Sequence, residues 1–308
     1  MCIVQGSAQW LCRPCVRYSA MHGATGLDGA IFPPTTRRPL ATNCWVHIAN
    51  TILHAPRGVH FVCTGPLTNL AILLKAFPEV MANIEEIIFM GGAIGIGNTT
   101  PAAEWNMWCD PEAAHVVVHS GLRVVMVPLD ATKHVPVTPD VLARLDSLPC
   151  TPPCSSSNSP GQSGNSPGQS SNSPGQSGNS PGQSGNSPGQ MAGCGSSSGE
   201  QGASLTSMLG GMLRFRNESI SKKYGSKHSW LHDPCTVAYV IDPSLVTLEH
   251  MHVDVEYKSA HCDGRTVCDR CVCVCNIFHV FNIHISHLLC RKWCGGGIVK
   301  GFFRKRKM

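Results

Sequence analysis

Polar side chains that could bind a sugar gather in one short stretch of this sequence. Asn98, Glu104 and Asn106 lie within nine residues of one another, and Trp105 stands between the last two. Amide groups donate and accept hydrogen bonds and a carboxylate accepts them, so the set suits a ligand with many hydroxyl groups. The alternative is a polar loop that leads into a capped helix, because Asp, Pro and Glu follow one another at 110–112.

A second pair of chemically competent residues stands before another expected helix. His232 and Asp233 directly precede Pro234. The carboxylate could ligate a hard cation, and the imidazole could transfer a proton near neutral pH. The alternative is an aspartate that caps the helix, with a histidine on the surface.

Two weaker clusters follow apolar runs. Thr64 opens the stretch Thr-Gly-Pro-Leu-Thr-Asn, and Met90 opens Met-Gly-Gly-Ala. A turn with a helix cap explains the first, and the glycines of the second allow a backbone to approach closely. Neither cluster is specific by itself.

The elements around these clusters alternate between strand and helix. Apolar β-branched runs predict strands at 59–63, 84–90, 122–129 and 245–257, and the helices expected are 68–77, 110–120 and 234–239. This order is typical of an α/β fold with an open, largely parallel sheet and flanking helices. Because ligands bind at the carboxyl ends of such strands, the clusters fall where a site is expected.

The composition divides the chain into four parts. A globular body is expected at 20–150 and again at 205–269, and a Cys- and His-rich basic tail, aberrant or unstructured, at 270–308. Between the two body parts, residues 151–204 repeat the heptad Asn-Ser-Pro-Gly-Gln-Ser-Gly and offer almost nothing apolar to bury. We expect this insertion to be disordered, either as a functional tether or as a tolerated expansion of a surface loop.

Charge and cysteine usage restrict the partners and the location. The net charge is +5 without a basic stripe through the body, so we expect no nucleic-acid partner. No secretory signal stands at the start, so a cytoplasmic location and mostly free thiols are expected for the 17 cysteines. A membrane anchor at 271–290 and a zinc site at Cys268 and its neighbours are alternatives that hydropathy and spacing do not favour.

Taken in order, the motifs resemble the inosine-uridine preferring nucleoside hydrolase family. The resemblance covers about 20–150 and 205–269 and adds the stretch His-Gly-Ala-Thr-Gly-Leu from His22 and Gly-Arg-Thr-Val from Gly264. It implies hydrolysis of the N-glycosidic bond of a ribonucleoside with a bound Ca²⁺ ion, and homo-oligomers are usual in the family. The transition state would be like an oxocarbenium ion.

The resemblance also implies a role for each candidate residue. Asp233 and the carbonyl of Thr64 would ligate Ca²⁺, and Asp233 would also contact ribose. His232 would be the general acid and would face the base with His22. The residues that would contact the sugar are Met90, through its backbone, Asn98, Glu104, Trp105 and Asn106.

One expected part of the family pattern is not found in this sequence. The family begins with an acidic loop, Asp-x-Asp-x-x-x-Asp-Asp, whereas here no Asp or Glu precedes Asp28. Since Ca²⁺ takes about six to eight oxygen ligands, its site would be incomplete. We therefore expect the 308-residue chain to be truncated, with an exposed sheet edge and little or no activity. The alternative is a non-catalytic protein that binds ligands or partners.

Overall fold

The computed structural model describes residues 2–16, 21–148, 204–270 and 277–282. The repeat segment expected to be disordered, 151–204, lies outside these residues except for Ser204. Within the described ranges, no helix is long and apolar enough to cross a membrane. Most of the possible anchor at 271–290 is not among them.

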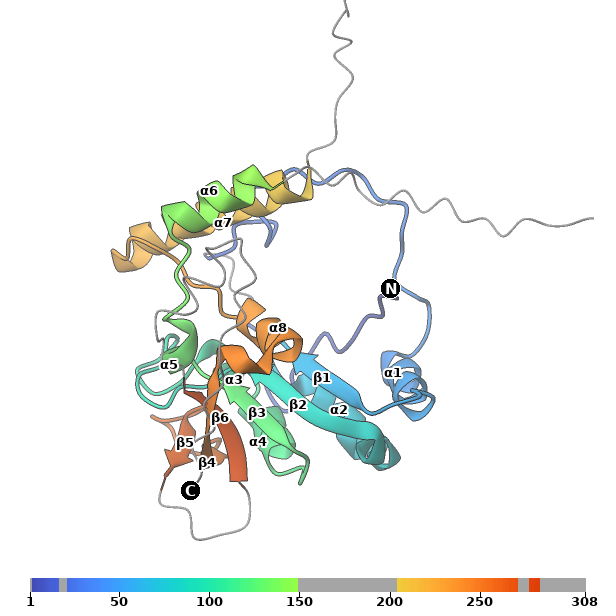
Figure 1. Ribbon diagram of the computed structural model, residues 1–308. Coiled ribbons are helices and arrows are strands. Elements are labelled where there is room, and N and C mark those ends of the chain that lie inside the picture. The colour runs from blue at the N-terminus through green and yellow to red at the C-terminus, as the bar shows by residue number, and fades with distance from the viewer. Residues whose placement is uncertain (1, 17–20, 149–203, 271–276, 283–308) are drawn as a thin grey trace, which may run out of the picture.

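A six-stranded sheet forms the centre of the molecule (Figure 1). Its strand order is β1-β2-β3-β6-β4-β5, so β1 is an edge strand within the described part of the chain. The strands are β1 (Val59–Cys63), β2 (Ile84–Met90), β3 (Val124–Val127), β4 (Thr247–Val255), β5 (Thr266–Asp269) and β6 (Ile277–Asn282). The first four in spatial order pair in parallel, and β4 runs antiparallel to β6 and β5. The predicted open, largely parallel sheet is confirmed.

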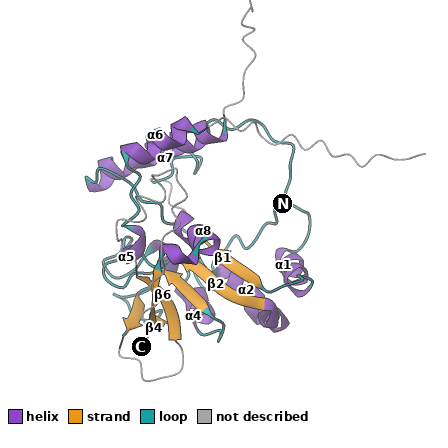
Figure 2. Ribbon diagram, viewed as in Figure 1, coloured by secondary structure: helices purple, strands orange, loops and turns teal. Residues whose placement is uncertain are grey.

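Helices cover both faces of the sheet (Figure 2). On one face, apolar residues of α1 (Cys44–Leu53), α2 (Thr68–Ala76) and α4 (Pro111–Val118) share a core with strand residues such as Phe89 and Met126. On the other face, Ala131 and Tyr239, from α5 (Leu129–Thr132) and α8 (Pro234–Ile241), pack with Ile88, Val125 and Val127. Burial on both faces explains the apolar runs Ile87–Met90 in β2 and Val124–Val127 in β3.

Two helices pack side by side apart from the sheet (Figure 1). They are α6 (Pro139–Ser147) and α7 (Leu205–Tyr224), which flank the long insertion in the sequence. Ser204 caps the start of α7 by accepting a hydrogen bond from the N–H of Ser207, and Gly225 ends it with φ of 65°. Both are strong boundary signals for a helix that the sequence analysis did not assign. The remaining short helices are α3 (Trp105–Cys109), η1 (Pro78–Asn83) and η2 (Pro243–Leu245).

The body extends beyond the boundaries expected from the sequence. β6 falls within the tail expected at 270–308, yet it pairs with β3 and β4. At the other end, residues before 20 also pack on the body. The N–H of Leu11 donates to Asp110 at 2.9 Å, and Arg13 binds Glu112 at 2.8 Å and also pairs with Asp263.

Candidate functional site

Glu104 is the carboxylate of the predicted sugar-binding stretch, and it is buried. It is 3% exposed and caps α3, and its Oε2 atom accepts the backbone N–H groups of Gly92, Asn106 and Met107 at 2.9–3.2 Å. Burial raises the pKa of Glu104 to about 7, although these hydrogen bonds oppose the change. All three bonds use Oε2, so Oε1 is the oxygen that can accept a hydrogen bond from a ligand.

Asn106 links this carboxylate to Met90. The Asn106 side-chain nitrogen donates to the carbonyl of Met90 at 2.9 Å, at the carboxyl end of β2. Both residues are buried. Asn98 belongs to the same loop and accepts the N–H of Trp105 through Oδ1 at 2.9 Å. Of the five residues predicted to contact the sugar in this part of the chain, Met90, Asn98 and Asn106 thus lie in one hydrogen-bonded group with Glu104.

Trp105, the fifth, packs its ring mainly on another tryptophan. Its ring centre lies 5.6 Å from that of Trp108, which in turn meets Trp10 edge-on at 6.3 Å. This aromatic cluster holds the 2–16 segment against α3. Trp105 is half-buried, so part of its ring stays accessible.

His232 is held by a buried hydroxyl group. Its Nδ1 atom lies 2.6 Å from Oγ1 of Thr132, at the end of α5. Burial, together with the positive charges of Arg216 and Lys133, lowers the pKa of His232 to about 4. The imidazole is therefore neutral at pH 7.

Arg216, on α7, contributes a positive charge to this group. Its Nη1 atom lies 3.0 Å from Nε2 of His22, which is solvent-exposed. The Arg216 charge lowers the pKa of Asp233, while loss of hydration raises it more strongly. The Asp233 charge also contributes to the raised pKa of Glu104. The His232–Asp233 pair thus interacts electrostatically with both Arg216 and Glu104 of the sugar-binding stretch.

Thr64 is exposed directly after β1. It lines an open pocket of about 300 Å³ at the carboxyl end of that strand, together with Gly65, Pro66 and Asn69. The Asn69 side chain has a structural role, because its Oδ1 accepts the N–H of Ser7 at 2.8 Å. No contact joins Thr64 to Asp233 among the described residues.

The described residues do not complete a Ca²⁺ site. Asp233 and the Thr64 carbonyl offer two ligands, whereas Ca²⁺ takes about six to eight oxygens. Arg216 places a positive charge near Asp233, which further disfavours a cation there. In the described part of the chain, the group of three side chains able to hold a metal is elsewhere: His115, His119 and Asp254.

Sequence reasoning missed Arg216 and Thr132. Arg216 lies on α7, whose caps Ser204 and Gly225 could have identified the helix. Thr132 lies two residues after Asp130, whose carboxylate accepts the N–H of Ile94 at 2.7 Å and so holds a loop. No local signal pairs Thr132 with a histidine one hundred residues away.

The sequence matches one protein family over nearly all of the described body. The family is described as "Inosine-uridine preferring nucleoside hydrolase", and residues 1–276 match it. This range includes the 2–16 segment that packs on α4.

Curated relatives and solved structures agree with this match. The pyrimidine-specific ribonucleoside hydrolase RihB of Shigella sonnei (strain Ss046) is 31% identical over 268 residues, which cover 87% of this chain and 69% of the relative. RihB of Escherichia coli (strain K12 / DH10B) is 30% identical over the same shares. The fold matches a purine-preferring ribonucleoside hydrolase from Gardnerella vaginalis with a TM-score of 0.70 and 22% identity, over 94% of this chain and 77% of that one.

Proposed function

Because this chain belongs to the inosine-uridine preferring nucleoside hydrolase family, we propose that it hydrolyses the N-glycosidic bond of ribonucleosides. One observation carries the proposal. Burial is the main cause of the raised pKa of Glu104, and the charge of Asp233 contributes to it, which supports the proposal that the His232–Asp233 pair and the sugar-binding stretch belong to one site. The names of the 30–31% identical relatives make pyrimidine ribonucleosides the first substrates to test.

The sugar is held by the stretch around Glu104. We propose that Oε1 of Glu104 accepts a hydrogen bond from a ribose hydroxyl, with Asn98 and Asn106 beside it. The Met90 carbonyl fixes Asn106, and three backbone N–H groups fix Glu104, so these groups are oriented before the ligand arrives. Preorganised polar groups stabilise a transition state at little reorganisation cost.

The base faces the histidines. His232 is the proposed general acid for the departing base, and His22 lies beside Arg216 at the exposed side. With a pKa of about 4, only about 0.1% of His232 is protonated at pH 7. Proton transfer by His232 would therefore be slow at neutral pH.

We propose that hydrolysis by this polypeptide is slow. A positioned general base typically contributes about 10²–10⁴-fold, and the described residues offer neither a complete Ca²⁺ site nor an evident base. Asp233 stays the best candidate to contact the ribose hydroxyls. Calcium dependence stays a prediction, tested by assays with CaCl₂ and with EDTA.

The test is release of base from uridine, cytidine and inosine by the 308-residue chain. Slow release is expected from the wild type and from D140N, which changes an exposed aspartate on α6. D233N is expected to reduce kcat/KM at least about tenfold, because a charged group loses its hydrogen bonds to substrate. Ligand binding without any release of base would overturn the proposal and favour a non-catalytic binding protein.

Four further expectations concern the location and the partners of the protein. We propose a cytoplasmic protein that associates with copies of itself and binds neither nucleic acid nor membrane. Light scattering of the purified chain, with cell fractionation, tests the first two points, and gel-shift and vesicle-sedimentation assays test the others.

A further inference from the structure

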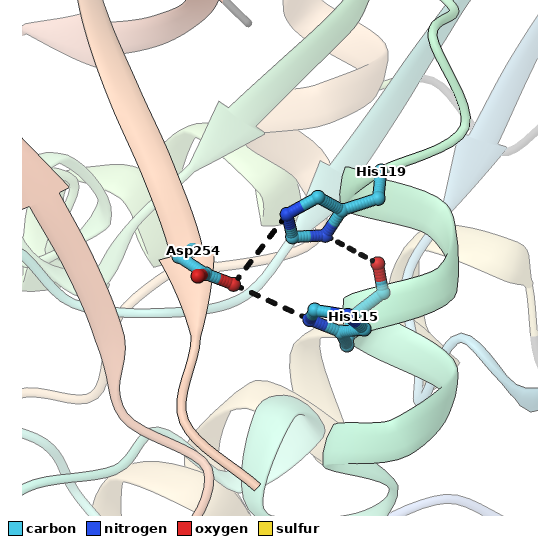
Figure 3. A group of neighbouring side chains, drawn as sticks. All are labelled: His115, His119 and Asp254. Carbon is cyan, nitrogen blue, oxygen red and sulfur yellow. Dashed lines mark hydrogen bonds and ion pairs between the residues drawn. The ribbon is translucent and has the colours of Figure 1, made fainter.

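Two histidines at the end of α4 and an aspartate of β4 point toward one another between these two elements (Figure 3). His115 and His119 are one helical turn apart, and Asp254 comes from β4. One ligand atom from each lies within 4.8 Å of the others. The helix positions explain the pairing of the histidines, because residues four apart share a face.

The tautomer of His119 is fixed by its own helix. Its Nδ1 atom lies 2.9 Å from the carbonyl oxygen of His115. A carbonyl only accepts hydrogen bonds, so Nδ1 carries the proton and Nε2 of the neutral ring carries a lone pair. That lone pair faces Oδ1 of Asp254 at 3.7 Å. Two electron-rich atoms face each other here, and a bound metal ion would relieve their repulsion.

The spacing suits a small divalent metal. Nδ1 of His115 lies 3.3 Å from the same Asp254 oxygen. In a tetrahedral zinc site with bonds of about 2.0–2.1 Å, neighbouring ligand atoms are about 3.3 Å apart. The measured separations of 3.3 and 3.7 Å are close to this value.

The surroundings add the features of a metal centre. The His115 carbonyl orients His119 from outside the ligand set, as hydrogen-bonded partners of metal-binding histidines do. Tyr257 packs its ring 4.6 Å from the ring of His115 and limits its rotation. His119 is exposed and the other two are half-buried, so a water molecule can supply a fourth ligand.

We propose that His115, His119 and Asp254 form a binding site for Zn²⁺ or a similar transition metal, separate from the hydrolase site. Two imidazoles and one carboxylate favour such ions over Ca²⁺, which prefers oxygen ligands throughout. The bound ion would join the end of α4 to β4. The proposal of this metal site does not depend on the proposed hydrolase activity.

The first test is equilibrium dialysis of the full chain against ZnCl₂. Variants H119Q and D254N each remove one ligand, and D254N preserves the shape of the side chain. The control is H54Q: His54 also ends a helix, and its Nδ1 also binds the carbonyl of the residue four positions earlier, at 2.8 Å. His54 is not part of the three-residue group found in the described chain.

The wild type and H54Q should bind one more equivalent of Zn²⁺ than H119Q and D254N, or bind it at least about tenfold more tightly. Even loss of an indirect partner of a metal site typically costs 10–100-fold in affinity. Equal stoichiometry and affinity in all four proteins would overturn the proposal.

Cobalt substitution separates this site from cysteine ligands elsewhere in the chain. The spectrum of wild type minus H119Q, each with Co²⁺, should show the visible bands of nitrogen and oxygen ligation without a thiolate charge-transfer band. Zn²⁺ should also raise the melting temperature of the wild type and H54Q more than that of the two ligand variants. A thiolate band in the difference spectrum, or equal thermal shifts, would contradict the assignment.

Discussion

The hydroxyl oxygen of Thr132 lies 2.6 Å from Nδ1 of His232. This contact joins the segment after β3 to the residue pair that precedes α8, although the two are far apart in sequence. Thr132 is fully buried, so its hydroxyl has a fixed position. The contact orients the imidazole and determines which ring nitrogen is directed into the site.

Replacing Thr132 by valine tests this orienting role. T132V keeps the shape of the side chain but removes a hydrogen bond of about 1 kcal/mol, so kcat/KM for nucleoside hydrolysis should fall about five- to tenfold. The loss should lie mainly in kcat, because Thr132 orients His232 rather than binding substrate. T132S retains the hydroxyl and should retain activity. Equal kinetics in T132V and the wild type would contradict the assignment.

The pH dependence of hydrolysis tests the two site residues with the largest changes in pKa. The pKa of His232 is about 4 and that of Glu104 is about 7. If protonated His232 and ionised Glu104 are both needed, about 0.1% of the enzyme has both states between pH 4 and 7. Then kcat/KM should be flat over that range and fall about tenfold per unit on either side.

The behaviour above pH 7 decides between two roles for His232. A general acid requires the imidazolium ion, so kcat/KM should decline there. A neutral imidazole that only donates a hydrogen bond would instead give a plateau above pH 7. In H232Q, the decline should disappear together with most of the activity. Circular dichroism at each pH serves as the control for unfolding.

The sequence predicted the bounds of two parallel strands without error. The runs at Val59–Cys63 and Ile84–Met90 became β1 and β2 without change, because short and mostly apolar segments of that length fit a parallel sheet. The expected strand at 122–129 was too long: Leu129 begins α5 instead of extending β3. The apolar pattern of a segment could not reveal β6, because its pairing with β3 and β4 is a long-range contact.

The site could be predicted only where its residues are close in sequence. Glu104 and Asn106 form one local motif, and their hydrogen bonds to Gly92 and Met90 agree with the expected loop. Arg216 enters from α7, on the far side of the long insertion, and no spacing rule connects it with Asp233. The pairing of His119 with Asp254 is likewise created by packing of α4 on β4.

Arg216 should control the charge of the histidines beside it. Its positive charge lowers the pKa of His232 and of His22. In R216Q, the pKa of both histidines should rise, and the pKa of Asp233 should rise as well, since Arg216 favours its charged form. The histidine ring signals followed by NMR against pH measure the change. R214Q is the matched control, because Arg214 on the same helix pairs with Asp146 instead; a similar change in R214Q would refute a specific effect.

Asp110 should be more important for stability than an ordinary helix cap. It is 0% exposed, and it accepts hydrogen bonds from Thr68 Oγ1 at 2.6 Å, Leu11 N at 2.9 Å and Ala113 N at 3.0 Å. D110A removes the cap of α4 and leaves buried donors without partners, which should cost about 2–4 kcal/mol. T138A removes the cap of α6, a single bond of 3.4 Å to Val141, and should cost about 1 kcal/mol or less. Urea unfolding followed by tryptophan fluorescence compares the two. A loss in D110A no greater than that in T138A would show that Asp110 does not hold the 2–16 segment and α2 to the start of α4.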